Sequence, residues 1–564
     1  MARSTSGSVW VGVALGLGAA AGCRPTPLDP SLLPVVPTEL SIVDPPAAAM
    51  VPAGAATVRG EVVALSDLTL NGVPVTVTGE RTWEAEVELP RGITTFELAG
   101  TDNRGDRVYL RQSVLAGDFA PAKGALPASV GIRLNQGGLD AASGFAADLL
   151  DPAGISALLP SLNPVYEDSY GLFGLDAVTI AADISALAFD PPEIALDPGA
   201  GALAIEIVLP NLDVTVPVSG EAIGIDFDEE LSVSASEVVV SGFLEVATTR
   251  DGGLSASLVD PEVALHDFSF DTSILPGPVE GLVLSDALQG VLEDLLVDQI
   301  AALVPPLLDD QLASLAIAFD TELLGQEMSF AASFDTVSID RDGIQLVADL
   351  DLDLAGPFPR SSVGYLVSGA PEPRPSTDPD LAVLLSDDVV NRLLHDTWRA
   401  GMLDLALSTD DGSLDGFVLA PFGSSTGSIT MDAGLPPVLV QHGDQATLEL
   451  GELTVTIDTP GGTQGNRLVV TAAGAIPLDV ELTAGALTMG LGTPALSLMV
   501  RESDWGATNE SLTDLLEHQL PIDVLLGLLG DLAIPMPTLG DLVIPDAAVG
   551  RDPSTLFTTI DMDL

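Results

Sequence analysis

The stretch "IQLVADLDLDL", residues 344–354, decides the fold because its apolar and polar side chains alternate. One set consists of Ile344, Leu346, Ala348, Leu350, Leu352 and Leu354, and the other set includes Asp349, Asp351 and Asp353. Successive side chains of a β-strand point to opposite faces of its sheet, so this period of two predicts a strand with one dry and one wet face. "LDVTVPVSG", residues 212–220, alternates in the same way. Dry faces need a cover.

Amphipathic helices are predicted to supply that cover. Residues 284–304, with Ser285 as N-cap, repeat their apolar side chains at helical spacing, and residues 135–150 and the segment from Asn509 onward are further helix candidates. The remaining candidate lies in residues 385–407.

In this last segment Ser386 is the predicted N-cap, followed by the acidic residues Asp387 and Asp388 in the first turn. Arg392, His395 and Arg399 fall on the side opposite the apolar residues, and we expect them to face water. Neighbouring residues on a helix point about 100° apart. His395 and Asp396 are therefore not expected to form a catalytic pair.

The charge of the chain is strongly negative. Its 82 acidic and 19 basic residues give a formal charge of -63 in 564 residues, which opposes binding to nucleic acid or to anionic lipid surfaces. We interpret this acidity as an adaptation for solubility rather than as a ligand site. Disorder is not its explanation, because 47% of the residues are hydrophobic and they alternate with polar residues.

The N-terminus resembles a bacterial lipoprotein signal. "MARSTSGSVWVGVALGLGAAAGC" places Arg3 before an apolar run that is shorter than the roughly 20 residues of a membrane-spanning helix, the alternative interpretation. Cys23, the only cysteine, stands where such a signal is cleaved and acylated with chains such as palmitate. We predict a signal peptide over 1–22 and a tether over 23–38. Arg24 favours attachment to the outer membrane over retention in the inner membrane.

Composition shifts divide the rest of the chain. Residues 39–118 contain short alternating segments with turns such as Asn71-Gly72, which predict a small antiparallel sandwich and resemble a bacterial Ig-like module. Two similar halves follow, at 128–325 and 381–564. Residues 326–380 between them are predicted to form a central sheet and a Pro-rich linker.

Three segments carry a further resemblance. They are "VGIRLNQGGLDAASGFAADLL" (130–150), "LSDDVVNRLLHDTWRAGMLDL" (385–405) and "IPMPTLGDLVIPDAAVG" (534–550). They resemble, in order, landmarks of the family of bactericidal/permeability-increasing, lipopolysaccharide-binding and lipid transfer proteins, within the tubular lipid-binding superfamily. The matching positions are Gly138, Leu139, Asp140 and Ala142 in the first segment and Asn391, Ala400 and Gly401 in the second.

The resemblance implies an α+β fold in which two elongated antiparallel β-barrels, set end to end, each wrap around long amphipathic helices and enclose an apolar pocket for acyl chains. The lipid-binding residues it implies are Leu139, Phe145, Leu149, Leu288, Leu292, Leu295, Val390, Leu393 and Leu394. Two features depart from the family. Its first-domain disulfide cannot form with Cys23 alone, and the acidity argues against binding of lipopolysaccharide.

Other chemistry is weakly indicated. "GSSTG", residues 423–427, fits a nucleophile elbow around Ser425, but no helix is predicted after it. The Asp-rich segments 340–343 and 410–416 do not complete a calcium loop and are predicted to be turns. No metal or cofactor motif appears.

We therefore predict a membrane-tethered lipoprotein that carries or senses a phospholipid or other acyl lipid without catalysis. It has no cofactor and no nucleic-acid partner in this prediction. A structural or adhesive surface lipoprotein without bound lipid is the alternative, and a serine lipase or esterase is a third possibility.

Overall fold

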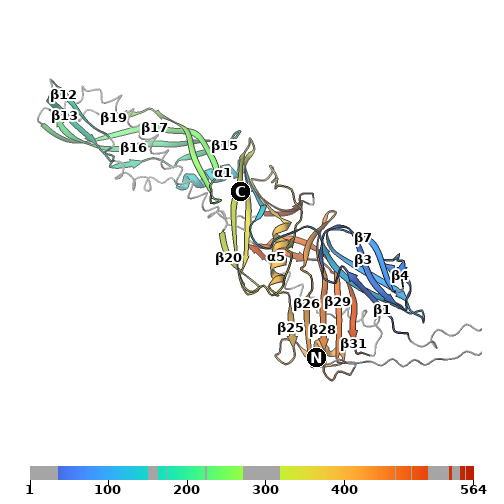
Figure 1. The fold of residues 1–564 in the computed structure, drawn as a ribbon. Coiled ribbons are helices and arrows are strands. Elements are labelled where there is room, and N and C mark those ends of the chain that lie inside the picture. Colours follow the sequence, from blue (N-terminus) through green and yellow to red (C-terminus); the bar gives the residue numbers. More distant parts are fainter. Residues whose placement is uncertain are drawn as a thin grey trace, which may run out of the picture. The chain divides into compact units, whose positions relative to one another are not determined.

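The computed structural model describes residues 36–79, 81–149, 163–164, 166–172, 175–222, 225–270, 318–463, 465–483, 486–505, 533–535, 547–552 and 554–563. These residues are mostly in strands (Figure 1). By their contacts they form two units, one of 36–44, 57–85 and 97–110, and one of 45–56, 86–96 and 111–563. The predicted signal, the tether up to residue 35, and the predicted helices over 284–304 and from Asn509 lie outside the described residues.

The N-terminal strands form two sheets, with orders β1-β3-β7-β6 and β2-β9-β8-β4-β5. Their bounds are β1 Glu39–Asp44, β2 Met50–Val51, β3 Gly54–Val63, β4 Ser66–Leu70, β5 Val73–Pro74, β6 Val77–Thr78, β7 Thr82–Leu89, β8 Gly92–Thr101 and β9 Arg107–Ala116. Trp83 and Leu98 are fully buried there. The strand segments agree with the predicted β-structure, except that β2 pairs with β9 in parallel. The Ig-like class stays a prediction.

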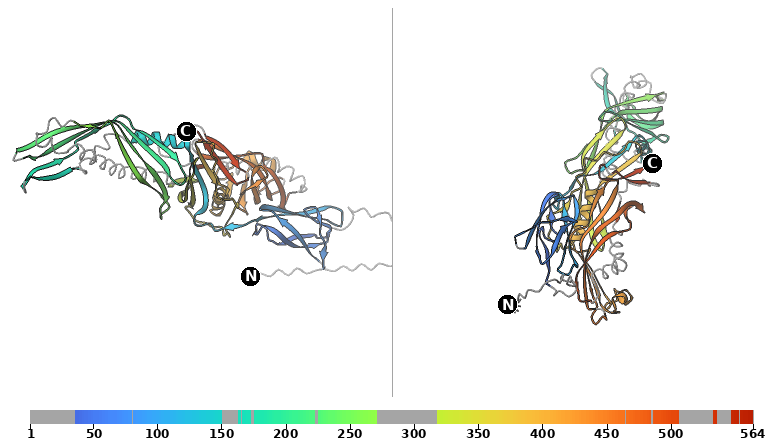
Figure 2. Two further views of the ribbon diagram at one scale, coloured as in Figure 1. Left: turned by 90° about the horizontal axis from the view of Figure 1, so that it is seen from above. Right: turned by 90° about the vertical axis from the view of Figure 1, so that its right-hand side faces the viewer.

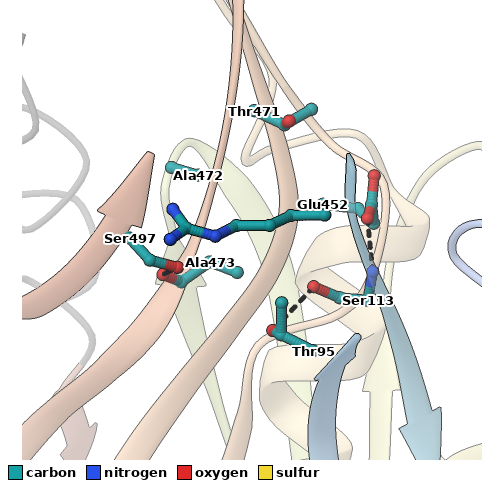
Figure 3. A pocket seen from close by; sticks show the side chains of 8 residues that line it. Thr95, Ser113, Glu452, Thr471, Ala472, Ala473 and Ser497 are labelled. Carbon is teal, nitrogen blue, oxygen red and sulfur yellow. Dashed lines mark hydrogen bonds between the residues drawn. The ribbon is translucent and has the colours of Figure 1, made fainter. Parts of the chain in front are cut away.

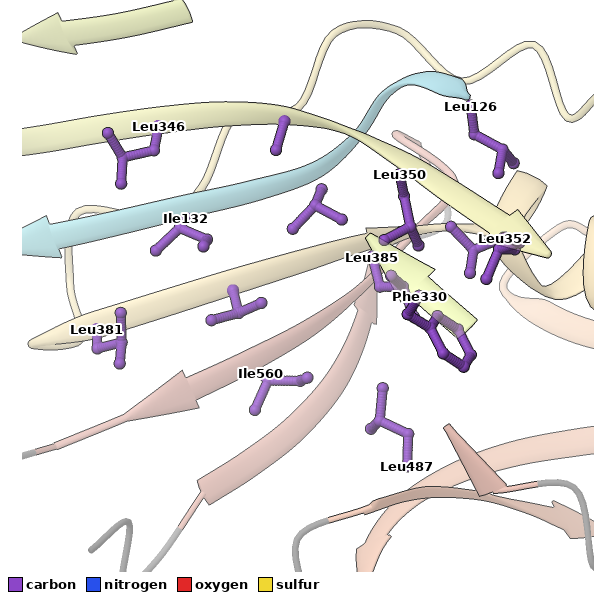
Figure 4. Packing of buried hydrophobic residues seen from close by; sticks show 14 of the residues in the cluster. Leu126, Ile132, Phe330, Leu346, Leu350, Leu352, Leu381, Leu385, Leu487 and Ile560 are labelled. Carbon is purple, nitrogen blue, oxygen red and sulfur yellow. The ribbon is translucent and has the colours of Figure 1, made fainter. Parts of the chain in front are cut away.

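A seven-stranded central sheet has the order β20-β21-β22-β11-β24-β34-β33. The bounds are β11 Leu126–Asn135, β20 Ala318–Leu323, β21 Gln326–Ile339, β22 Gly343–Leu354, β24 Leu381–Ser386, β33 Ala547–Asp552 and β34 Phe557–Met562. Its middle strands thus come from the beginning, the middle and the end of the predicted lipid-binding region. Side chains such as Ile132, Leu350, Leu381 and Ile560 converge on one face of it (Figure 4).

Two further eight-stranded sheets form half-barrels on separate parts of the chain (Figures 1 and 2). The first contains β12 Tyr166–Leu172, β13 Leu175–Ala182, β14 Ala186–Ala188, β15 Glu193–Pro198, β16 Leu203–Ala222, β17 Ile225–Thr248, β18 Leu254–His266 and β19 Ser269–Phe270. The second contains β25 Leu405–Ser408, β26 Ser428–Ala433, β27 Val438–His442, β28 Gln445–Asp458, β29 Arg467–Thr483, β30 Ala486–Leu491, β31 Ala495–Ser503 and β32 Ala533–Pro535. The short strands β10 Phe119–Ala120 and β23 Tyr365–Leu366 pair separately.

The described helices are α1 (Gln136–Leu149), α5 (Asp387–Arg399) and the 3-10 helix η3 (Gly416–Phe422). The first two confirm predicted helices, and the Ser386 side chain accepts a hydrogen bond from the Asp388 N–H as the predicted N-cap. None of the helices in the described ranges is long and apolar enough to cross a membrane.

Strand β22 confirms the predicted alternation of buried apolar and exposed polar residues over 344–354. Leu350 is 4% exposed within the central core, whereas the adjacent Asp351 is exposed on the opposite face. We expect Leu350→Ala to lower the free energy of unfolding by about 2 to 5 kcal/mol, because it leaves a cavity in a packed core. Asp351→Ala is the matched control and should change stability by less than about 0.5 kcal/mol. Urea denaturation of both variants measures this, and equal losses would contradict the one-sided burial.

Candidate functional site

The dry face of the first half-barrel is a long, continuous apolar surface. Its buried residues on β16 and β17 are Leu203, Ile205, Ile207, Leu209, Leu212, Val214, Val216, Val218, Phe227, Leu231, Val233, Ala235, Val238, Val240 and Leu244. The two strands pair in antiparallel register from Leu203 opposite Leu244 to Ala222 opposite Ile225. Exposed polar residues such as Glu206 and Asp213 alternate with them on the wet face.

The alternation of buried and exposed residues shifts by one position along this dry face. Odd-numbered residues are buried on β16 up to Leu209, and even-numbered residues are buried from Leu212 onward. Asn211 between them has a φ of 52°, in the left-handed region that Asn tolerates better than most residues. On β17 the parity changes at the facing position, between Ala235 and Val238. Both strands therefore keep their apolar side chains on the same face through this irregularity.

Of the predicted lipid-binding residues in the first half, Leu139 is 3% exposed on α1, which packs against β15 and β11. It belongs to the same hydrophobic core as the buried residues of β16. Phe145 and Leu149 lie in the second half of α1, but their side chains are outside the described structure. The predicted residues Leu288, Leu292 and Leu295 also lie outside the described residues.

The predicted residues of the second half are on α5. Val390, Leu393 and Leu394 are buried in the same continuous core, where α5 packs against β11, β22 and β24 of the central sheet and against β27. Asn391, fully buried among them, accepts a hydrogen bond from Leu439 N at 2.7 Å and donates one to Leu439 O at 3.2 Å. These two hydrogen bonds attach β27 to the helix. The sequence signal for this role was a single Asn within an otherwise apolar stripe.

The prediction that the charged side of α5 faces water is wrong. Arg392 is 3% exposed and His395 is 1% exposed, and the Arg399 side chain is only 18% exposed. The linker between the two halves covers this side: Phe358, Arg360, Ser362 and Tyr365 all contact α5 side chains. A helical wheel could not show this, because it contains only the residues of the helix itself.

Hydrogen bonds and ion pairs satisfy most of the buried polar side, although Arg399 Nε has no hydrogen-bond partner among the described residues. Arg392 Nε donates to Asp396 Oδ2 at 2.5 Å, and its Nη2 donates to the backbone oxygens of Ala122 and Leu352 at 2.7 and 3.3 Å. His395 Nε2 lies 2.7 Å from Ser362 Oγ. His395 Nδ1 lies 3.3 Å from Asp396 Oδ1, so the expectation that these neighbours cannot pair is also wrong.

Arginine–aromatic contacts add to this attachment. The guanidinium of Arg399 lies 4.4 Å from the ring centre of Phe358, that of Arg360 lies 5.3 Å from Trp398, and that of Arg392 lies 5.6 Å from Tyr365. Such contacts stabilise by about 0.5 to 2 kcal/mol each. The hydroxyl and aromatic side chains of the Pro-rich linker were missed from the sequence. Tyr365 was the available signal for these contacts, because the chain has only four tyrosines and one of them lies in the linker.

Ser362, His395 and Asp396 contact one another in the sequence of a hydrolase triad. Their surroundings, however, suit attachment of the linker to α5 rather than catalysis. The Gly364 N–H donates to Ser362 Oγ itself at 3.0 Å, instead of pointing to a place where an oxyanion would form. Asp396 is paired with Arg392, which weakens its ability to stabilise an imidazolium. Burial lowers the pKa of His395, so the ring is neutral at neutral pH. These contacts hold the linker on α5.

The other predicted catalytic and metal-binding candidates are found in loops. The segment after Ser425 enters strand β26 and the segment before it is η3, which is the reverse of the strand and helix that a nucleophile elbow needs. Residues 340–343 and 410–416 are turns and bends, apart from Gly343 at the start of β22 and Gly416 at the start of η3. Among the described residues no group of three or more His, Cys, Asp or Glu side chains is placed to hold a metal ion.

A small polar cavity lies beside β28, lined by Thr95, Arg111, Ser113, Glu452, Thr471, Ala472, Ala473 and Ser497 (Figure 3). Thr95 Oγ1 and Ser113 Oγ are 2.9 Å apart, and Ser113 N donates to Glu452 at 2.5 Å. Burial raises the pKa of Glu452. At about 10 Å³ the cavity has room for roughly one water molecule and is far too small for an acyl chain.

Comparison with known proteins adds little to this geometry. No protein-family model matches the chain, and no curated protein sequence matches it. Among 32 solved chains with a similar structure is the crystal structure of lipopolysaccharide binding protein, with 14% sequence identity and a TM-score of 0.43. The similarity covers 78% of this chain and 98% of that one. A similarity of this degree assigns no ligand, so the function has to be argued from the strands and side chains themselves.

The buried imidazole provides a test of the linker attachment. His395→Ala should lower the free energy of unfolding by about 2 to 4 kcal/mol, because it leaves a cavity and unpaired polar partners. The unfolded pKa is about 6.5 and the folded pKa is lower, so the unfolded state binds more protons as the pH falls below 6.5. The stability difference between wild type and His395→Ala should therefore shrink as the pH is lowered from 7 toward 5.

His266→Ala is the control, because His266 is exposed on β18. It should change stability by less than about 0.5 kcal/mol at either pH. Urea titrations at pH 5 and 7 measure both variants. A His395→Ala variant as stable as His266→Ala would show that the imidazole does not hold the linker.

Proposed function

We propose that this protein binds the acyl chains of a lipid on the dry faces of its half-barrels and carries or senses that lipid without catalysis. The observation that carries this proposal is the apolar face of β16 and β17, more than 40 residues of paired strand whose fully buried members are all uncharged. One charged residue, the half-buried Glu229 opposite Val218, shares this face near its end. An acyl chain is long, flexible and entirely apolar. A long, predominantly apolar face is therefore complementary to it, whereas a compact polar substrate would need convergent polar groups.

The described strands of this half-barrel contain neither of the two serines considered as nucleophiles. The described serines with a catalytic resemblance, Ser362 and Ser425, lie elsewhere, and neither has the surroundings that nucleophilic attack requires. The sequence landmarks around Leu139 and Asn391, which resemble those of lipid-binding proteins, support the same proposal. A scaffold whose dry faces are filled only by its own side chains is the competing function.

Lipid bound to the purified protein tests carrier against scaffold. We expect organic extraction and mass spectrometry to find acyl lipid in the wild-type protein. Ile207→Trp, Val214→Trp and Val218→Trp place a bulky ring on the dry face of β16 at three positions along the strand. At a position where an acyl chain lies, the ring should displace lipid with little loss of melting temperature. In a solid core the same change overpacks and costs about 1 to 3 kcal/mol.

Ser219→Trp is the matched control, because Ser219 is exposed on the wet face directly beside Val218. It should retain both lipid and stability. Wild-type protein free of lipid, or three dry-face variants that all lose stability without a selective loss of lipid, would favour the scaffold.

We also propose that Cys23 is acylated and tethers the protein to the outer membrane. The support is the sequence of residues 1–23, with Arg3, the apolar run and small residues before the cysteine. Acyl chains on a single cysteine provide enough buried methylene groups for stable anchoring. Cys23→Ser should abolish labelling with a fatty-acid probe and move the protein out of the membrane fraction. Unchanged labelling of the variant would show that Cys23 is not the acylated residue.

A further inference from the structure

The first half-barrel is the most one-sidedly charged part of the described chain. Between residues 166 and 270 there are 20 Asp and Glu residues, one arginine, one histidine and no lysine. On β17, Asp226, Asp228 and Glu230 are exposed, and they alternate with the buried Phe227 and Leu231 of the dry face. The carboxylates therefore form a row on the wet face, directly behind the apolar surface.

This charge is not spread evenly over the molecule, as an adaptation for solubility alone would predict. Arginines occur around the central sheet and α5, where they are paired with carboxylates: Arg133 with Asp340, Arg360 with Asp404 and Asp432, Arg392 with Asp396, and Arg551 with Asp387. The first half-barrel has only Arg250, at the turn between β17 and β18. Its carboxylates have almost no opposite charge nearby on the same sheet.

A ligand on the dry face is close to these carboxylates. A single sheet is thin, and stacked layers of side chains and backbone are only about 10 Å apart. A lipid that lays its acyl chain on the dry face keeps its headgroup in water at the rim, within about one Debye length of the wet face at 0.1 M salt. The headgroup therefore experiences the field of several carboxylates together.

Resting on the proposed lipid binding, we propose that the first half-barrel selects lipids with a zwitterionic or uncharged headgroup and excludes lipids with an anionic headgroup. A like charge at about 10 Å in water weakens binding by roughly twofold. Several such carboxylates together give an expected preference of about tenfold at low salt. The field is electrostatic and extends through water, so added salt must reduce the preference.

The experiment compares two short-chain lipids with identical acyl chains, one with a phosphocholine and one with a phosphoglycerol headgroup. Both are presented as monomers, below the concentration at which they form micelles, so that no charged lipid surface contributes. Delipidated full-length protein is titrated with each lipid at 20 mM and 500 mM NaCl. Binding is measured by calorimetry. The phosphocholine lipid should bind about tenfold more tightly at low salt, and the difference should nearly vanish at high salt.

A charge-reversal variant tests whether the named carboxylates cause the preference. Asp226→Lys/Asp228→Lys/Glu230→Lys should bind the phosphoglycerol lipid several-fold more tightly than wild type at low salt and leave phosphocholine binding nearly unchanged. Glu39→Lys/Asp44→Lys/Glu61→Lys makes the same change in net charge at exposed positions of the N-terminal sheets, and it should leave the preference as in wild type.

The outcomes separate the two proposals. Equal or tighter binding of the phosphoglycerol lipid at low salt overturns the headgroup selection and leaves acyl-lipid binding intact. Equal effects of the two triple variants assign the preference to net charge and overturn the role of the β17 row. Absence of binding for both lipids, at both salt concentrations, overturns the proposed function itself.

Discussion

The dry face of the β16–β17 pair is the constraint on which the rest of this structure depends. Burial of a Val, Leu or Ile side chain contributes roughly 1.5 to 3 kcal/mol. The eight buried side chains of β16 alone therefore represent more than about 10 kcal/mol, as much as the net stability of a typical domain. A strand pair of this length cannot leave that face in water. Helix α1 packs against β15, the strand beside β16, and the proposed acyl chain would shield apolar surface by the same physical effect.

Helix α5 obeys a second constraint, which follows from its position between the central sheet and β27. Every residue from Val389 to Trp398 is buried, and the next residue, Arg399, is partly exposed. A charged side chain in such a place is costly unless it is paired and hydrogen-bonded. The linker contributes Ser362 as the partner of His395, and its aromatic rings contact the arginines of the helix. The helix itself contributes Asp396 as the partner of Arg392. The linker is thus part of the core rather than a passive connection.

The sequence predicted the elements whose pattern is local. The alternation in residues 344–354 predicted β22, and the helix and N-cap at Ser386 were also confirmed. Two features were not predictable because they depend on distant segments. The central sheet joins strands from residues as far apart as Leu126 and Met562, and the polar side of α5 is covered by residues outside the helix. The shift of the alternation at Asn211 was missed for a third reason, since a period-two pattern cannot anticipate a left-handed residue.

The central sheet and the first half-barrel share one hydrophobic core, but their charges are arranged differently, and this difference bears on the proposed site. In the central sheet, side chains from β11, β22, β24 and β34 converge on one face (Figure 4), and the arginines around it are paired with carboxylates. On the first half-barrel the apolar residues lie in rows along two long strands, and residues 166–270 contain 20 Asp and Glu residues but only one arginine. Paired charges around the central sheet suit a structural role for that sheet. Long apolar rows under an unbalanced field suit the proposed binding of a flexible chain and the proposed selection of its headgroup, and both proposals concern the same sheet.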